Sequence, residues 1–168
     1  MRHIDWSPPD LHVPWGQALR EGAVAGTAAG LLPTLVLAAL GRRHGGPTGP
    51  INAVSHWLWG DESLRQDRAT LRHTAIGLVT QQLAAILWAT LYSAVYGHRE
   101  EAKELPNAIA GGIATSATAY VVDYTITPEP LTPGYERRVD GKEMFAVYAV
   151  LAAGFTLGAL ALRGAGRR

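Results

Sequence analysis

The stretch that decides the fold is NAIAGGIATSATAYVVDYTIT, residues 107–127. Pro106 suits the first position of a helix and Pro128 ends one, so the two prolines mark the boundaries of a single helix. The roughly 21 residues between them reach about 30 Å, the thickness of the hydrocarbon core of a membrane. Asp123 is the only acidic residue among them. The stretch therefore predicts a membrane-spanning helix that carries one carboxylate.

Small and polar residues share one face of this predicted helix: Ala108, Gly111, Gly112, Thr115, Ser116, Ala119, Asp123 and Thr127. Asp123 should therefore point at protein, because a carboxylate facing lipid is costly. The expected donors to this carboxylate are Thr127, Tyr120, Tyr124, and Gln81 or His73 on a neighbouring helix. A transport role and a structural role are both open, and the position of Asp123 near the helix end favours a structural anchor.

Charge-free runs occur at residues 22–41, 74–97, 105–122 and 144–162. A soluble bundle would carry charges on its outer faces at every second turn, whereas these runs carry Leu, Val, Ile and Ala there. The sequence therefore predicts an all-α integral membrane bundle of four transmembrane helices. The spans are expected at about 18–41, 71–97, 106–127 and 143–163, within a single transmembrane domain over residues 1–168.

Glycines at four-residue spacing predict close helix packing. The expected packing positions are Gly22, Gly26, Gly30, Gly112, Gly154 and Gly158. Small residues at this spacing let two backbones approach closely in lipid. We predict that the first and third spans pack together, through the first three glycines on one side and Gly112 with Ser116 on the other. Arg20 and Glu21 come before the apolar part of the first span and are expected to mark the membrane–water interface.

The longest connection, residues 42–71, contains the segment INAVSHWLWG at 51–60. Ten residues are too few to cross a membrane, so a short interfacial or re-entrant helix is expected at about 50–59. Trp57 and Trp59, together with Trp6 and Trp15 before the first span, are the expected interfacial anchors. His56 is expected to be a polar residue on the surface of this helix.

The second span carries two adjacent amides near its centre, Gln81 and Gln82. An amide in lipid needs a partner, so at least Gln81 should form a hydrogen bond with another helix. With His73 at the edge of the span, the candidate polar intramembrane site comprises Asp123, Gln81, Thr115, Ser116, Thr127 and His73.

Composition excludes several chemistries. The net charge is +1, so no nucleic-acid partner is expected, and the absence of cysteine removes thiol–disulfide mechanisms. No paired histidines lie deep in two spans, and no Glu-x-x-His pair or nucleotide-binding loop occurs. We therefore expect no metal, no cofactor and no catalytic residue. Arginine greatly outnumbers lysine, and alanine and glycine are abundant, which is typical of a bacterium with a GC-rich genome.

Two parts of the chain, NAVSHWLWGD at 52–61 and VDYTITP at 122–128 with LTPGYE at 131–136 after it, resemble a family of small four-span inner-membrane proteins of proteobacteria. The resemblance covers roughly residues 50–155. It implies the four-span fold and a multi-pass location in the bacterial inner membrane, and it carries no activity. Basic residues divide almost evenly between the two sides, so cytoplasmic termini are the default, favoured by the basic C-terminus.

Two classes of function fit these observations. The first is a non-catalytic accessory, assembly or helix-packing subunit of a larger membrane complex or homo-oligomer, motivated by the small-residue faces. The second is an oligomeric transporter or channel for a small solute or ion, motivated by the polar stripe around Asp123. An enzyme acting at the interface ranks third, because the sequence presents no nucleophile–base pair. For each of these classes, we expect the lipid bilayer to surround the protein and to be one of its partners.

Overall fold

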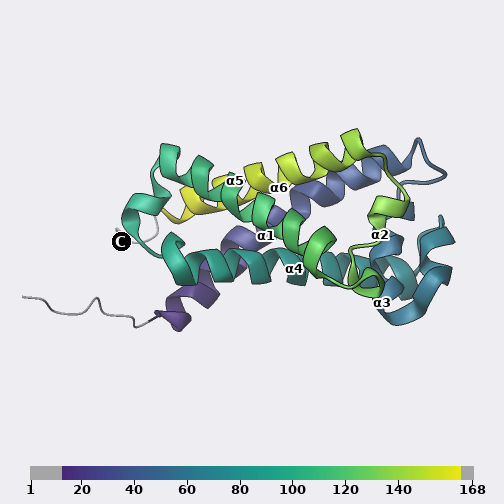
Figure 1. Ribbon diagram of the computed structural model, residues 1–168, viewed down its shortest axis with the longest axis horizontal. Helices are drawn as coiled ribbons and strands as arrows, with labels where there is room; N and C mark the ends of the chain where they lie inside the picture. Colours follow the sequence, from purple (N-terminus) through teal and green to yellow (C-terminus); the bar gives the residue numbers. More distant parts are fainter. Residues whose placement is uncertain (1–12, 164–168) are drawn as a thin grey trace, which may run out of the picture.

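The computed structural model describes residues 13–163, and within that range every regular element is a helix. The long helical segments lie side by side (Figure 1). They are α1 (Trp15–Gly41), the segment Leu71–Gly97, α5 (Leu105–Val121) continued by η5 (Val122–Ile126), and α6 (Gly141–Leu162). The second of these consists of η2 (Leu71–Ala75), α4 (Ile76–Tyr92) and η3 (Ser93–Gly97). The predicted all-helical class is confirmed.

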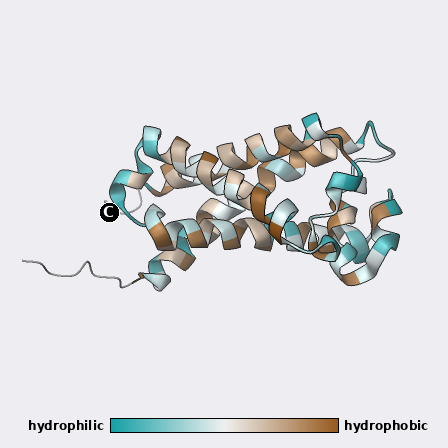
Figure 2. Ribbon diagram, in the orientation of Figure 1, coloured by the Kyte–Doolittle hydropathy of each residue, from teal (hydrophilic) through white to brown (hydrophobic). Residues whose placement is uncertain are grey.

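Within the described residues, three helices are long and apolar enough to cross a membrane: α1, Leu71–Gly97 and α6. They coincide with the predicted spans at 18–41, 71–97 and 143–163. Large apolar side chains point outward along them, including Leu35 at 67% exposed, Leu83 at 60% and Phe145 at 76%. Figure 2 shows apolar residues distributed along the long helices and polar residues gathered at their ends. This distribution is consistent with a membrane protein, in which lipid rather than water surrounds the outer faces.

The ends of the helices follow from local chemistry. Asp140 caps α6 by accepting hydrogen bonds from the backbone N–H groups of Lys142 and Glu143, and the Glu143 side chain completes a capping box. Pro106 lies in the first turn of α5, where no intrahelical donor is lost. Wider π-helical turns form η2, η3 and η5, each at the end of a long helix. The described chain therefore changes helical pitch where the bundle meets its loops.

The long helices form a row rather than a closed ring. The central helix α1 packs against both α4 and α6, and α6 packs between α1 and α5. Because α4 and α5 contact each other only slightly, a space is left between them on the α6 side.

Glycine allows the close approach of α1 to both of its neighbours. Added Cβ atoms at Gly22, Gly26 and Gly30 would meet Thr90, Ile86 and Gln82 of α4, and those at Gly154 and Gly158 would meet Ala29 and Ala25 of α1. Gly112 faces Ala152 and Thr156 of α6. The predicted pairing of the first and third spans is therefore wrong. Small-residue faces predict close packing, but any such face can pack against any other, so spacing does not select the partner.

Short elements close one end of the bundle, here named the cap end. They are α2 (Gly49–Val54), α3 (His56–Trp59), η1 (Gly60–Arg65), η6 (Glu129–Leu131) and η7 (Tyr135–Arg137). The start of α1, the turn η4 (Glu100–Lys103) and the end of α6 lie at the other end (Figure 1).

The helix expected at 50–59 is in fact two helices that meet at Ser55. All six residues of α2 are buried, so α2 fills the end of the bundle rather than lying on a membrane surface. Only α3 is exposed, with Trp57 45% and Trp59 37% accessible. Trp15 is 54% exposed at the opposite end, and Trp6 lies outside the described residues.

Candidate functional site

A cleft lies between α4 and α5, where these helices separate. The face of α6 forms its inner wall, and α3 with the loop before η7 closes it at the cap end. Its polar and aromatic lining comprises Trp57, Thr80, Gln81, Trp88, Asp123, Tyr135 and Tyr148. The cavity volume is about 50 Å³, which is room for roughly three or four water molecules.

Asp123 lies in this cleft within a short chain of hydrogen bonds. The Tyr148 hydroxyl of α6 donates to Oδ2 of Asp123 at 2.7 Å, and the Tyr135 hydroxyl donates to the Tyr148 oxygen at 3.2 Å. Tyr135 and Tyr148 are only 3% and 8% exposed. The carboxylate belongs to η5, and π-helical turns are frequent at functional sites. Asp123 therefore points into the bundle, bound by hydroxyl groups on one side.

The donor to Asp123 is not one of those expected from the sequence. The rings of Tyr120 and Tyr124 pack around Tyr148, with centroids 5.1 Å and 6.2 Å away. The Tyr124 hydroxyl donates instead to Glu136 at 3.4 Å. Tyr148 was overlooked because it lies on another span, although it shares the buried face of α6 with Leu151 and Met144. Helical register identifies that face, but not which helix lies opposite it.

The other predicted site residues are dispersed. The Thr115 hydroxyl donates to the Gly111 carbonyl of its own helix at 2.8 Å, and the Ser116 hydroxyl donates to the Tyr148 carbonyl of α6 at 2.7 Å. Thr127 is the residue at which η5 ends, and it is partly exposed. The structure therefore brings together only Asp123 and Gln81 from the predicted set, as residues that line one cleft.

The two amides of α4 have different roles. Nε2 of Gln82 donates to the Gly26 carbonyl of α1 at 2.9 Å, which ties the two helices together. Gln81 is partly exposed in the cleft, and within residues 13–163 its side chain makes no hydrogen bond. The prediction that Gln81 joins two helices is wrong, since its neighbour takes that role and leaves Gln81 free to meet a ligand.

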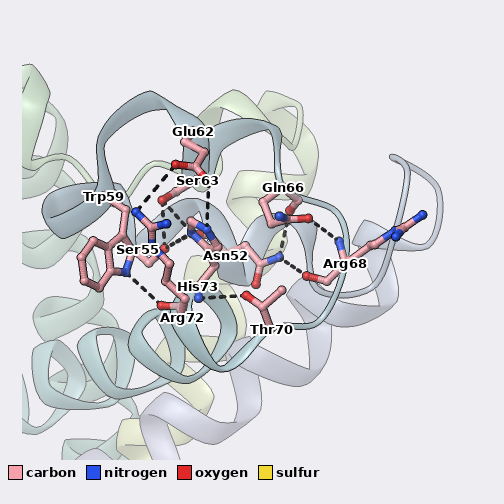
Figure 3. Close-up of polar contacts among 10 residues, drawn as sticks. All are labelled: Asn52, Ser55, Trp59, Glu62, Ser63, Gln66, Arg68, Thr70, Arg72 and His73. Atoms are coloured by element: carbon pink, nitrogen blue, oxygen red, sulfur yellow. Dashed lines mark hydrogen bonds and ion pairs between the residues drawn. The ribbon is translucent and has the colours of Figure 1, made fainter.

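His73 belongs to a separate polar group, the cap cluster of Asn52, Ser55, Ser63 and His73 (Figure 3). Nδ1 of His73 lies 3.0 Å from the Ser63 hydroxyl and 3.3 Å from that of Ser55. Asn52 donates to the carbonyls of Gln66 and Arg68, each at 2.9 Å, and accepts from the Thr74 hydroxyl at 2.7 Å. The cap cluster thus fastens α2 to the loop before α4.

The cap cluster has the composition of a hydrolytic site but not its accessibility. Nε2 of His73 lies 3.6 Å from a carboxylate oxygen of Glu62. The imidazole therefore lies between a carboxylate on one side and the Ser63 hydroxyl on the other. Ser55 and Ser63 are completely buried and His73 is 2% exposed. A nucleophile must reach a substrate carbonyl, which these hydroxyls cannot do in this arrangement. The cap cluster is therefore structural, and it satisfies the polar groups of a buried connection.

A buried ion pair at the opposite end also escaped the sequence reasoning. Glu21, expected at the interface, is 8% exposed and accepts from Nζ of Lys103 at 2.8 Å and from the Ser93 hydroxyl at 2.6 Å. Burial alone would lower the pKa of Lys103, but its hydrogen bonds to Glu21 and Glu100 outweigh burial and raise the pKa above its ordinary value. The pair joins the start of α1 to the turn before α5.

No group of three His, Asp or Glu side chains within the described part of the chain is placed to hold a metal ion. Comparisons with family models, curated proteins and solved structures gave no match to this chain. The argument for function therefore rests on the geometry of the cleft and of the helix packing.

Proposed function

We propose that α5 with η5 is a fourth membrane span, so that the chain crosses a bacterial inner membrane four times. Leu105–Ile126 is long enough at about 1.5 Å per residue. One face packs on α6, and the other presents Ile113 at 57% and Ile126 at 69% exposure, as a lipid-facing surface requires. The arginine-rich composition and the resemblance of residues 50–155 to small inner-membrane proteins support the location.

In this proposal the protein is a non-catalytic accessory or assembly subunit that acts by binding, within a larger membrane complex or as a homo-oligomer. The carrying observation is that Thr115 and Ser116, in the polar stripe of α5, are buried. Thr115 and Ser116 are 7% and 3% exposed, and both hydroxyls donate to backbone carbonyls inside the bundle. A hydrated pathway along α5 would need these hydroxyls to face water or solute. Here the Ser116 hydroxyl joins α5 to α6, which is the usual role of such groups in a membrane bundle, and the Thr115 hydroxyl bonds within its own helix.

Transport is the second candidate, and one observation favours it. Asp123 borders an open cleft, and a carboxylate within a span is commonly part of an ion or proton pathway. On this alternative, the cleft would be one half of a pathway that a conformational change completes.

Reconstitution into liposomes separates the two candidates. The purified chain and the Asp123→Asn variant are each incorporated at equal density, and proton flux is followed with an internal pH-sensitive dye. The binding proposal predicts that both give the flux of empty liposomes. A flux that only the unsubstituted chain supports, with the variant still folded, would establish transport. In parallel, extraction from native membrane should yield a defined oligomer or complex, whereas a lone monomer would contradict the subunit role.

A further inference from the structure

The Asp123 carboxylate has no counter-charge within residues 13–163. Glu21, Glu129 and Asp67 each pair with a lysine or arginine, but Asp123 is in no ion pair and accepts from a single hydroxyl. The two arginines of the loop that follows η5 have other partners: Arg137 pairs with Glu129, and Arg138 pairs with Asp67. A carboxylate in a low-dielectric site needs a proton or a cation, and the described residues place no cation beside Asp123.

A second carboxylate adds negative charge close to the same place. Glu136 accepts from the hydroxyls of Thr132 at 2.7 Å and Tyr124 at 3.4 Å, and it too is in no ion pair among the described residues. Its partner Tyr124 packs against Tyr148, which carries the donor to Asp123. The cap end beside the cleft is thus anionic on its inner side, and a cation is the ligand that this charge favours.

The walls of the cleft select the kind of cation. Aromatic surface comes from Trp57, Trp88, Tyr135 and Tyr148, and apolar surface comes from Ala84, Ala85 and Leu151. A calcium or magnesium site is usually built around more than one carboxylate or carbonyl oxygen, and Asp123 is the one carboxylate of this lining. An organic ammonium group is attracted both to a carboxylate and to the faces of aromatic rings, and it sheds water at low cost.

We propose that this cleft binds an organic ammonium group, with Asp123 as its counter-ion and Trp57 and Trp88 as its aromatic walls. The cleft reaches from Trp57 of α3, at the cap end, along α4 to Trp88. Tryptophan is enriched at the level of lipid headgroups, so we expect a headgroup to enter the cleft from the end that carries Trp57. The group can therefore belong to an amine-bearing phospholipid whose tail lies along α4 and α5, or to a free amine. This inference rests on the proposed function, in which the cleft is a binding site, and it assigns that site a ligand class.

Isothermal titration of the full chain in a neutral maltoside detergent tests the proposal. Ethylammonium chloride is the free-amine probe, because it is small enough for a cavity of about 50 Å³, and sodium chloride at equal ionic strength is the blank. For the lipid source, nanodiscs of phosphatidylglycerol with or without phosphatidylethanolamine are titrated with the same probe. Saturable binding of ethylammonium is expected. Phosphatidylethanolamine should weaken this binding if the lipid amine occupies the site and leave it unchanged if the site takes only free amines. No heat beyond that of sodium would overturn the proposal.

Two variants localise the binding. Asp123→Asn should weaken ethylammonium binding about 30-fold or more, because the cation loses a desolvated counter-ion. Glu129→Gln, which removes an exposed carboxylate from the next loop, is the matched control and should bind as the original chain does. If Asp123→Asn does not fold, Trp88→Leu leaves every charge in place and should weaken binding about fivefold through the lost aromatic wall. Unchanged affinity in a folded variant of either kind would overturn the assignment.

The outcomes also separate this inference from the proposed function. Cation binding accompanied by flux across liposomes would retain the ligand class and reject the binding-only function. Absence of both binding and flux would reject the ligand class and leave the subunit role intact.

Discussion

Replacing Gly154 with alanine should force α6 and α1 apart at their crossing. A Cβ at Gly154 would lie 2.5 Å from Cα of Ala29, about 0.9 Å closer than the 3.4 Å at which ordinary contacts begin. It would also lie 3.1 Å from the backbone nitrogen of Ala29 and 3.2 Å from the carbonyl oxygen of Ala28. All three neighbours are backbone atoms, so no side-chain rotation can relieve the overlap, and one helix must move by nearly 1 Å.

The expected cost follows from two opposing effects. Overpacking a tight contact costs about 1–3 kcal/mol, while alanine gains up to about 1 kcal/mol over glycine in a helix. We therefore expect Gly154→Ala to lower the free energy of unfolding by about 1–2 kcal/mol. The loss should be larger for Gly154→Leu, because a longer side chain has no space to enter between two backbones.

Gly141→Ala provides the matched control on the same helix, because an added Cβ at Gly141 meets nothing within 4 Å. Thermal unfolding of both variants and of the original chain in one detergent, followed by circular dichroism, gives the comparison. Gly141→Ala should unfold at or slightly above the original temperature, and Gly154→Ala clearly below it. If the two variants unfold together, α1 and α6 do not touch at Ala29, and the central position of α1 in the row of helices is wrong.

Three further perturbations test other parts of the structure. Lys103→Met leaves the buried Glu21 carboxylate without its counter-ion and should lower the free energy of unfolding in detergent by about 3 kcal/mol. Adding Glu21→Leu should recover most of this loss. A double variant no more stable than the single one would contradict the pairing. Asn52→Ala leaves two carbonyls and one hydroxyl of the cap end unsatisfied, so it should lower the free energy of unfolding by about 3 kcal/mol or more. Asn107→Ala removes only an exposed hydrogen bond and should be nearly neutral. Equal losses would refute the role of the cap cluster. The backbone N–H groups of Glu143 and Lys142 lower the pKa of Asp140 below its ordinary value of 3.8, so its stabilisation is present above that value and is lost as the pH falls through the folded pKa. Asp140→Asn still caps the helix and should lose less stability on acidification than the original chain, and an equal loss would argue against the cap.

Helix positions could be predicted well because lipid thickness and charge set them. The charge-free runs at 74–97 and 144–162 fall within the observed Leu71–Gly97 and Gly141–Leu162. Pro106 and Pro128 correctly bounded the helical stretch that holds the polar stripe. These signals are local, so they need no knowledge of the partner helix.

The partners of each face could not be predicted, because they depend on how the helices are arranged. The glycines at 22, 26 and 30 of α1 meet α4, although their spacing would equally suit α5. Tyr148 reaches Asp123 only because α6 packs against α5 on that side. Glu21 and Lys103 lie 82 residues apart in the sequence, so spacing gives no indication of their pairing.

The cap end was the least predictable region. The tryptophans at 57 and 59 indicated an interfacial segment, and α3 is indeed exposed. The preceding turn, α2, instead turns into the bundle, where Asn52 and Ser55 find buried partners. A run of Asn, Ser and His in a loop is typical of a solvated surface, and only the folded-back path of the chain makes these residues a core.

Cysteine accessibility tests the central claim, that water reaches the cleft but does not reach the buried hydroxyls of the polar stripe of α5. The sequence contains no cysteine, so the labelling of a single introduced cysteine can be measured in membranes without any background from native cysteines. A small, permeant, water-soluble thiol reagent should modify Gln81→Cys readily and Ser116→Cys scarcely, because Gln81 lines the cleft and Ser116 is 3% exposed between α5 and α6. Rapid modification of Ser116→Cys in a folded protein would reveal a hydrated path along α5. That result would contradict the binding-only account and favour transport.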